Sequence, residues 1–463
     1  MRFDRHFIKE AVPNIIFTSD VHLEQYQFSI DTRTLSAGDI FIALKGVHVD
    51  GHHFIKEALH KGAAGVIIQR DKHNALNDGI AELKNKLVMT VPDTHETLLL
   101  LAHAWRKKFI IPIVGITGSV GKTSTKELLA AIVRNAHMDT FVSHGTENTE
   151  IGCALNLLRL RAHHQIGIFE MGINKRGEMA KLAQLVQPTT AIITNVGHSH
   201  MEGLGSLQDI ALEKRDIFKF FKEDSIGIIN GDLSLLGSVA YSHPVIKCGS
   251  KTVNQVQARK ISINSDSISF TLKLYREKYT VTLKKNHEGA IFNALVAAAA
   301  AHLLGIPSDN IIQGLESETV VPRRFEKRYL RSGMGILIDD CYNANPESMK
   351  AALLAFEKIK TNAEKIVILG DMHELGVNSP FWHRQIGRFL RKVPSVKRLI
   401  LVGDLVKWTK KTMPVGVAVE LVSSWQEASE LIKKQLLVES CVLVKGSNSM
   451  KLSNLVDELS SSQ

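Results

Sequence analysis

The sequence predicts an α/β protein of three domains in which parallel sheets form most of the core. Its 463 residues exceed the length that a single hydrophobic core ordinarily fills. Short apolar segments alternate with helix-like segments in three blocks along the chain. Such alternation is typical of sheets covered by helices. We expect the domains to span residues 1–109, 110–322 and 323–463.

The first block reads as a small N-terminal α/β domain followed by a linking helix. Apolar runs such as "DIFIALKG" and "AAGVIIQ" alternate with the helical segment "HHFIKEALHKG". Residues 94–109 then carry apolar side chains at helical spacing, and Thr94 stands where a helix cap is expected. We therefore expect a helix over 94–109 that links this domain to the next.

The second and third blocks each predict a sheet with parallel strands. The central block contains the nearly continuous apolar strands "IIPIVGIT", "QIGIFEMG", "TTAIITNVG" and "SIGIIN", as expected for a sheet buried on both faces. The segment "ISINSDSISFTLKLYREKYTVTL" alternates and suggests antiparallel strands. After the basic stretch 323–331, the segments "GILIDD", "KIVILGD", "RLILVGD", "VAVELV" and "CVLVKG" predict a C-terminal Rossmann-like domain.

Composition is that of an ordinary globular protein. Hydrophobic residues make up 44% and charged residues 22% of the chain. No apolar run approaches the roughly 20 residues that cross a bilayer, and the N-terminal sequence lacks the apolar core of a signal peptide. We expect a cytoplasmic monomer without stable membrane insertion. The four cysteines form no CxxC pair, which argues against a disulfide framework and a zinc site.

The net charge of +10 suits anionic ligands or nucleic acid, although a solvated lysine-rich surface gives the same sum. A nucleic-acid-binding ATPase would cluster its basic residues with exposed aromatic side chains. Only 323–331 is a basic cluster, and aromatic residues make up 6% of the chain. We expect no nucleic-acid partner; salt-sensitive DNA binding would favour that alternative.

The segment "GITGSVGKTSTKE" (115–127) lies between a predicted strand and a predicted helix and reads as a phosphate loop. Glycines there let backbone N–H groups converge on phosphate oxygens at a helix N-terminus. The Lys122 ammonium is expected to reach the β- and γ-phosphates, and the Thr123 hydroxyl to bind Mg²⁺. The nucleotide-binding residues predicted from the loop are Gly118, Ser119, Gly121, Lys122, Thr123 and Ser124.

The loop differs from the commonest phosphate-loop pattern, because five residues instead of four separate Gly115 from Gly121. "TGSVGKTSTKE" resembles the ATP loop of the Mur ligase family, whose form is TGxxGKT. "DTRTLSAGDIFIALKGVHVDGHHF" is similar to the UDP-binding N-terminal domain of that family. "DDCYNANPESMKAAL" and "GDMHELG" resemble the family member that adds D-alanyl-D-alanine.

The resemblance implies an ATP-dependent amide ligase of peptidoglycan precursor synthesis. Its substrates would be UDP-N-acetylmuramoyl-tripeptide and D-alanyl-D-alanine. A carboxylate does not react with an amine at neutral pH until its oxygen becomes a good leaving group, and by resemblance ATP supplies this through an acyl phosphate. Two polyanions must then meet, so cations are required at the site.

The resemblance also implies a metal and catalytic set. Glu170 ends a predicted buried strand, where ligand crevices of open α/β sheets lie, and a carboxylate suits Mg²⁺. His200 matches the family's metal-binding histidine in "HxEGxGS", whereas we assign His198 no role. Lys214 matches a lysine carried as a carbamate, which would turn an ammonium into a carboxylate-like ligand. The implied catalytic residues are Lys122, Glu170, His200 and Lys214, and the residues implied for two Mg²⁺ ions are Thr123, Glu170, His200 and Lys214.

Further residues are implied for the nucleotide and the substrate. Arg324 matches an arginine that touches the γ-phosphate on domain closure, with its register against Arg323 left open. We assign His383 no chemical role. The remaining nucleotide set is Asn293, Asp340, Tyr342, Asn343 and Asn345, and the substrate set is Thr32, Arg33, Lys45 and Asn148.

Four positions depart from the family pattern. Thr146 and Thr149 replace asparagines, Ala290 lacks an expected amide side chain, and Asn448 stands where an arginine is common. Two alternatives therefore stay open. One is another Mur or folylpolyglutamate-type amide ligase with a different acceptor, against which "DTR" and "GDIFIALKG" argue. The other is a noncatalytic nucleotide-binding relative, which would bind ATP and never form ADP.

Overall fold

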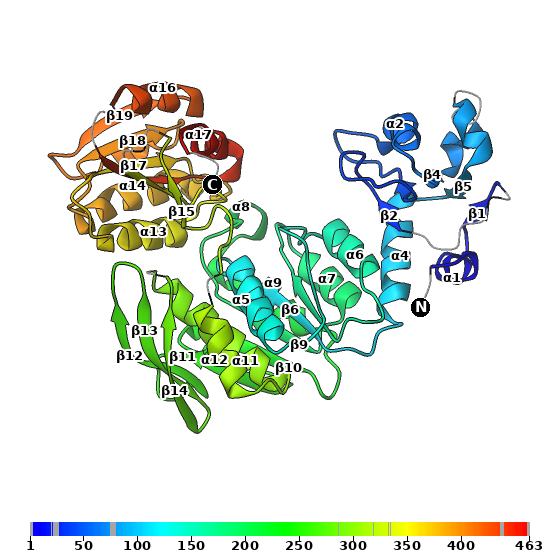
Figure 1. Ribbon diagram of the computed structural model, residues 1–463, viewed down its shortest axis with the longest axis horizontal. Helices are drawn as coiled ribbons and strands as arrows, with labels where there is room; N and C mark the ends of the chain where they lie inside the picture. Colours follow the sequence, from blue (N-terminus) through cyan, green and yellow to red (C-terminus); the bar gives the residue numbers. More distant parts are fainter. Residues whose placement is uncertain are drawn as a thin grey trace.

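The computed structural model describes residues 3–19, 21, 27–74, 80–285, 287–317, 319–331, 333, 335–435 and 439–460. Three separate sheets form three lobes, which lie in chain order from blue through green to red in Figure 1. This confirms the predicted three-domain α/β arrangement. Among the helices of the described residues, none combines the length and the apolar character needed to cross a bilayer.

The N-terminal lobe contains a five-stranded sheet in the order β1-β5-β4-β3-β2. The four strands from β2 to β5 are parallel, and β1 pairs antiparallel with β5. The strands are Ile16–Phe17 (β1), Phe28–Ser29 (β2), Ile40–Ile42 (β3), Gly65–Gln69 (β4) and Leu87–Val91 (β5), and the helices are Arg5–Ala11 (α1) and Ile55–His60 (α2).

Helix α4 (Thr94–Arg106) links the first two lobes and packs against α6 and α7 of the central lobe. The Trp105 indole N–H donates to the carbonyl of Leu160 at 3.2 Å. The buried Arg106 guanidinium donates to three backbone carbonyls, those of Val186, Phe109 and Gln187. Helix α4 therefore belongs to the core of the central lobe as much as to that of the first lobe.

The predicted cap of α4 is wrong by one residue. The side chain of Asp93 caps the helix by accepting from the Glu96 N–H at 2.8 Å. Thr94 is the first helical residue, and its hydroxyl donates to the carbonyl of Ala43 at 2.9 Å. An aspartate satisfies the free N–H groups of the first turn and leaves the threonine hydroxyl to bond the sheet.

The central lobe contains a nine-stranded sheet in the order β14-β13-β12-β11-β10-β9-β6-β8-β7. Its β7 to β12 side is parallel, and β12, β13 and β14 form the antiparallel extension that the sequence predicts. The strands are Ile113–Thr117 (β6), Thr140–Val142 (β7), Ile166–Glu170 (β8), Thr190–Ile193 (β9), Ile226–Asn230 (β10), Val245–Gly249 (β11), Val256–Ile263 (β12), Ile268–Leu274 (β13) and Glu277–Leu283 (β14).

Helices cover both faces of the parallel part of this sheet. Helices α4, α6, α7 and α9 share one apolar core, and α5, α11 and α12 share the core on the other face. Burial on both faces explains why β6, β8 and β9 are apolar throughout. The helices are Lys122–Asn135 (α5), Glu150–Leu158 (α6), Glu178–Val186 (α7), Met201–Leu204 (α8), Leu207–Arg215 (α9), Ser234–Gly237 (α10), Gly289–Leu303 (α11) and Ser308–Glu316 (α12).

The C-terminal lobe contains a six-stranded sheet in the order β15-β16-β20-β17-β18-β19. All pairs are parallel except β15 with β16, so part of the basic stretch 323–331 forms an edge strand. Helices α13 and α14 cover one face, and α16 and α17 the other. The elements are Glu326–Tyr329 (β15), Gly335–Asp339 (β16), Pro346–Lys358 (α13), Glu364–Gly370 (β17), Ser379–Phe389 (α14), Arg398–Val402 (β18), Lys407–Lys410 (α15), Ala418–Val422 (β19), Trp425–Gln435 (α16), Ser440–Lys445 (β20) and Leu452–Leu459 (α17).

Candidate active site

The glycine-rich loop joins the end of β6 to the first turn of α5, as predicted. Gly118 and Gly121 have φ values of 151° and 86°. A Cβ atom on Gly118 would lie 1.8 Å from Oγ1 of Thr194, and one on Gly121 would lie 2.5 Å from Oδ1 of Asn293. Both positions therefore require glycine, for conformation and for space.

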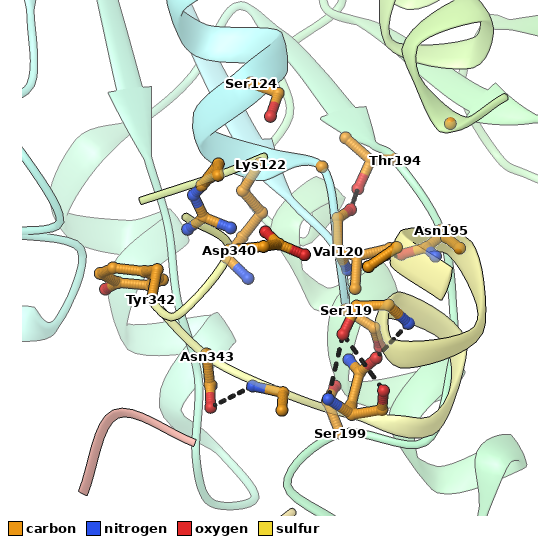
Figure 2. Close-up of a pocket in the computed structure, with 18 of the residues that line it drawn as sticks. Ser119, Val120, Lys122, Ser124, Thr194, Asn195, Ser199, Asp340, Tyr342 and Asn343 are labelled. Atoms are coloured by element: carbon orange, nitrogen blue, oxygen red, sulfur yellow. Dashed lines mark hydrogen bonds between the residues drawn. The ribbon is translucent and has the colours of Figure 1, made fainter. Parts of the chain in front are cut away.

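Neighbouring residues at the end of β9 hold the loop in place (Figure 2). The Asn195 amide oxygen accepts from the Val120 N–H at 2.8 Å, and the Thr194 hydroxyl donates to the Val120 carbonyl at 2.6 Å. The Ser119 hydroxyl donates to the Gly197 carbonyl and accepts from the Gly197 N–H, both at 3.0 Å. The loop is thus organised by the protein itself, which lowers the entropic cost of binding an anion there.

Lys122 is the first residue of α5, and its ammonium donates to the carbonyl of Gly118 at 2.8 Å. Burial lowers the pKa of Lys122, and the Arg324 guanidinium lowers it further, while the Glu170 carboxylate opposes both. Two cationic side chains from different lobes therefore face one space. A polyphosphate in that space would neutralise their mutual repulsion.

Glu170 ends β8 and is buried, with an exposed fraction of 1%. One carboxylate oxygen accepts from the Thr123 hydroxyl at 2.8 Å, and the other from the Asn148 amide at 2.7 Å. A hydroxyl and a carboxylate supply hard oxygen ligands of the kind that Mg²⁺ takes. Among the described residues, no three His, Cys, Asp or Glu side chains converge as a metal site, so water and phosphate oxygens would complete the coordination shell of such an ion.

Lys214 lies in α9 and is buried, with an exposed fraction of 1%. Burial holds the pKa of Lys214 well below its ordinary value, and the nearby Lys122 ammonium lowers it further. The adjacent Glu213 does not neutralise it fully, because its carboxylate accepts the N–H groups of Gly177 and Met179. Burial therefore shifts Lys214 toward the neutral amine, which is the form that adds CO₂.

A cavity of about 370 Å³ lies between the central and C-terminal lobes. It collects most of the predicted nucleotide-binding residues from both lobes (Figure 2). Those on its wall are Ser119, Gly121, Lys122, Ser124, Asn293, Arg324, Asp340, Tyr342, Asn343 and Asn345, and the predicted metal residue His200 also lines it. Gly118, Thr123, Asn148, Glu170 and Lys214 are not on the wall. Glu170 instead lies behind the loop, bonded to Thr123 and Asn148.

Arg324 bridges the two lobes. Its guanidinium donates to the Thr123 hydroxyl at 2.9 Å and lies 4.3 Å from the centre of the Tyr342 ring. Arg323 turns away, toward Asp457 of α17. Of the two arginines left open by the sequence, the structure brings Arg324 to the phosphate loop.

Asp340, Asn343 and Asn345 follow β16 and hold their own loop. Burial raises the pKa of Asp340, while Lys445, whose ammonium lies 2.8 Å away, opposes this shift. The amide oxygen of Asn343 accepts from the Ala344 N–H, and that of Asn345 caps α13 by accepting from the Ser348 N–H. These three side chains line the cavity and at the same time shape the loop that forms its wall.

Two histidine–glutamate pairs join the lobes, and the sequence analysis missed both glutamates. The imidazole of His200 lies 2.6 Å from the carboxylate of Glu374. His198 pairs with Glu347 of α13 at 2.5 Å, and its backbone N–H donates to the same carboxylate. The "GDMHELG" motif contains Glu374, but only the docked lobes show which side chain it meets.

His383 supports the loop that carries Glu374. It is buried, its ring accepts from the Met372 N–H at 3.1 Å, and its other ring nitrogen lies 2.8 Å from the Ser379 carbonyl. Burial lowers the pKa of His383, so the neutral ring is favoured. The residue therefore has a positioning role, which explains why no chemical role could be assigned from the sequence.

Family models match three successive parts of the chain. The model described as Mur ligase family, catalytic domain, matches residues 25–106; the Mur ligase middle domain matches 116–301; and the Mur ligase, glutamate ligase domain, matches 323–448. The chain belongs to the Mur ligase family. It is 33% identical over 463 residues to UDP-N-acetylmuramoyl-tripeptide--D-alanyl-D-alanine ligase of Bacillus subtilis, with 98% of each chain covered.

Solved structures of Mur ligases agree with this assignment. The chain superposes on MurF from Acinetobacter baumannii with a TM-score of 0.85 and 26% identity, covering 99% of both chains. It superposes on MurF ligase from Thermotoga maritima in complex with ADP with a TM-score of 0.78 and 26% identity, covering 93% of this chain and 96% of that one. This Mur ligase thus shares its three-lobe arrangement with a relative that binds ADP.

The predicted substrate residues of the first lobe do not reach the cavity. Thr32 is buried, and its carbonyl accepts from Lys61 at 2.9 Å. Arg33 pairs with Asp31 at 2.6 Å, and Lys45 is exposed. In this Mur ligase they lie in the sheet loops of the N-terminal lobe, and their contact with a uridine diphosphate stays a prediction.

The departures from the Mur ligase pattern have local accounts at two positions. Thr149 caps α6, because its hydroxyl accepts from the Gly152 N–H at 3.3 Å, a task that asparagine also performs. Ala290 is buried in the first turn of α11. Thr146 and Asn448 are exposed, and nothing in the structure explains these two residues.

Proposed function

We propose that this protein is an ATP-dependent ligase that joins D-alanyl-D-alanine to UDP-N-acetylmuramoyl-tripeptide. The observation that carries the proposal is the hydrogen bond from Arg324 of the C-terminal lobe to Thr123 of the phosphate loop. This contact brings Arg324 into the cavity that holds Lys122, and residues of both lobes form the wall of that cavity. The B. subtilis relative carries the name of this activity, which supports the choice of substrates.

ATP, bound with Mg²⁺, would transfer its γ-phosphoryl group to the peptide carboxylate, giving an acyl phosphate and ADP, and the amine of the dipeptide would then displace inorganic phosphate to form the amide. The protein's own part is to hold and shield the reacting groups. The loop N–H groups, Lys122 and Arg324 oppose the negative charge of the phosphates. The docked C-terminal lobe excludes water that would hydrolyse the activated carboxylate.

We infer that Thr123 and Glu170 hold one Mg²⁺ ion, and that His200 and a carbamate on Lys214 serve a second. The contact between the Thr123 hydroxyl and the Glu170 carboxylate supports the first assignment. The burial and the lowered pKa of Lys214 support the second, because both favour the neutral amine that adds CO₂, and the resulting carbamate would place a negative charge near the Lys122 ammonium. Asn148 would act through Glu170, whose carboxylate it binds.

The remaining assignments follow from the substrates. We infer that Thr32, Arg33 and Lys45 of the first lobe contact the uridine diphosphate, and that the domains divide at residues 109 and 322 or close to them. Both substrates and ATP are small metabolites of the cytoplasm, where we place the reaction. We infer that the protein works as a monomer, because one chain supplies both walls of the cavity.

A coupled assay tests the proposal. We expect ADP release only when UDP-N-acetylmuramoyl-tripeptide is present, and a UDP-linked pentapeptide product when D-alanyl-D-alanine is added. Single amino acids are expected to replace the dipeptide poorly. Equal ADP release without the tripeptide would contradict the proposal, and ATP binding without any ADP formation would favour the noncatalytic alternative.

A further inference from the structure

Arg323 and Arg324 are adjacent in sequence, but their guanidinium groups contact different parts of the molecule. Arg324 enters the cavity and reaches Thr123. The Nη2 atom of Arg323 donates to both carboxylate oxygens of Asp457 in α17, at 3.2 and 2.9 Å. A second contact joins Arg323 to the fully buried Asp339 of β16 at 3.8 Å. The C-terminal helix is therefore connected through one residue to the arginine of the nucleotide site.

The backbone on both sides of Arg324 is under strain. Arg323 has φ 60° and Phe325 has φ 55°, values that favour glycine. A residue other than glycine stays in this region only where its surroundings hold it there. The conformation directs the Arg324 side chain across the lobe boundary, so relaxation of the strain would turn it away from Thr123.

Several contacts hold the strained segment. The Arg323 N–H donates to Glu326 at 2.8 Å, and the Phe325 N–H donates to Asp340 at 3.1 Å. The Arg323 carbonyl accepts from the Tyr342 N–H at 3.2 Å. Arg328 strengthens the side-chain anchor, because it also meets Asp457 at 3.2 Å and Asp339 at 3.3 Å.

We propose that Asp457 and Asp339, acting through Arg323, are positioning residues that aim Arg324 at the phosphate site. The inference rests on the proposed function where activity is measured, whereas a measurement of ATP affinity tests it independently of that function. Asp457 is half-exposed, so its substitution is tolerated by the fold more readily than that of the buried Asp339. The adjacent Glu458 offers a matched control, since its carboxylate binds Lys433 and Ser429 of α16 instead.

The test is a double-mutant cycle between Asp457→Asn and Arg324→Ala, with Glu458→Gln as control. We expect Asp457→Asn to lower kcat about tenfold and to weaken ATP binding about fivefold, because a small displacement of a charged group costs rate steeply. In the Arg324→Ala background the same change is expected to alter either quantity by less than about twofold, because the group it positions is gone. Glu458→Gln is expected to match the parent.

A second variant separates the positioning of Arg324 from the positive charge at residue 323. Arg323→Lys keeps the positive charge, but its single ammonium cannot contact Asp457 and Asp339 with separate nitrogen atoms, as Nη2 and Nη1 of Arg323 do, and we expect it to reproduce the loss seen with Asp457→Asn. Equal losses in the parent and Arg324→Ala backgrounds, or a loss for Glu458→Gln equal to that for Asp457→Asn, would overturn the inference. If the parent chain binds ATP but makes no pentapeptide, the proposed function fails, while the cycle in ATP affinity still decides this inference.

Discussion

The Thr123 hydroxyl and the Arg324 guanidinium meet at 2.9 Å across the boundary between two lobes. The same hydroxyl donates to the buried Glu170 carboxylate at 2.8 Å, so one oxygen atom links the C-terminal lobe to the strand end behind the phosphate loop. Docking of the C-terminal lobe therefore also brings the positive charge of Arg324 to the phosphate loop. Each of the following predictions tests a part of that arrangement or of the scaffold that supports it.

Arg324→Ala is expected to lower kcat of ligation by about 10²- to 10³-fold, because it removes a cation aimed at charge that develops during phosphoryl transfer. Steady-state kinetics with saturating dipeptide measures the loss. The control is Lys397→Ala, whose ammonium bonds the carbonyl of Pro394 away from the cavity. A loss of less than about threefold for Arg324→Ala would remove this residue from the reaction.

Lys214→Ala is expected to lose at least about a hundredfold in activity and to recover part of it with added acetate or formate, which restore a carboxylate near Lys122. The parent enzyme should respond to removal of bicarbonate, and ¹³C-labelled bicarbonate should give a carbamate carbon signal that the variant lacks. An alanine at the exposed Lys219 serves as control. Full activity of Lys214→Ala would contradict the assignment.

Glu374→Gln is expected to raise KM for ATP about threefold to tenfold, because it weakens the contact with His200 that joins the lobes. Glu288→Gln is the matched control. It removes another pair across the lobes, with Lys358 at 3.4 Å, but its carboxylate is largely exposed and should contribute little. Equal shifts for the two variants would show that the His200–Glu374 pair has no special part in closure.

His287 makes stability depend on pH. Burial, followed by the Lys285 ammonium, lowers the pKa of His287 from 6.5 to about 4. The unfolded chain therefore binds a proton that the folded chain does not, between these two values, and folding stability falls as pH drops from about 6.5 to 4. Urea unfolding at pH 7 and pH 4.8 should show a smaller drop for His287→Gln than for the parent. An unchanged drop, or the same effect from the exposed His53→Gln, would contradict this.

Arg106→Met is expected to destabilise the protein by about 3 kcal/mol, because buried carbonyls lose a charged donor. Burial lowers the pKa of Arg106 to about 10, which still leaves the guanidinium charged at neutral pH. Urea unfolding measures the change. Lys107→Met, at the exposed end of the same helix, should shift stability by less than about 0.5 kcal/mol. Equal effects would show that the anchor of α4 lies elsewhere.

The local parts of the site followed from the sequence, because glycine, strand and helix signals act over a few residues. The phosphate loop, the end of β8 with Glu170 and the antiparallel strands β12 to β14 all lie where their patterns predict. A resemblance then identified residues such as Lys214, whose burial no periodicity reveals. The cap of α4 was misplaced by one residue, since Asp93 and Thr94 are both good caps and tertiary contacts decided between them.

Contacts between segments that are distant in sequence, within a lobe or between lobes, could not be predicted in this way. Glu347, Glu374 and Asn195 carry no local signal, because each acts on a partner that is distant in sequence. The same holds for Arg323 and Asp457, which lie 134 positions apart. A basic stretch in the sequence does not reveal that one arginine, Arg323, reaches the C-terminal helix and the next, Arg324, reaches the phosphate loop.

Helix α4 sets the distance between the first lobe and the central lobe. Its 13 residues span about 20 Å. Because Trp105 and Arg106 bond the central lobe, the helix cannot pivot freely at that end. Under the proposed function, the helix would fix the distance between a uridine group bound by the first lobe and a carboxylate at the phosphate loop. A precursor with a shorter peptide would stop short of the reacting atoms, so selection by reach would act before any side chain of the acceptor is recognised.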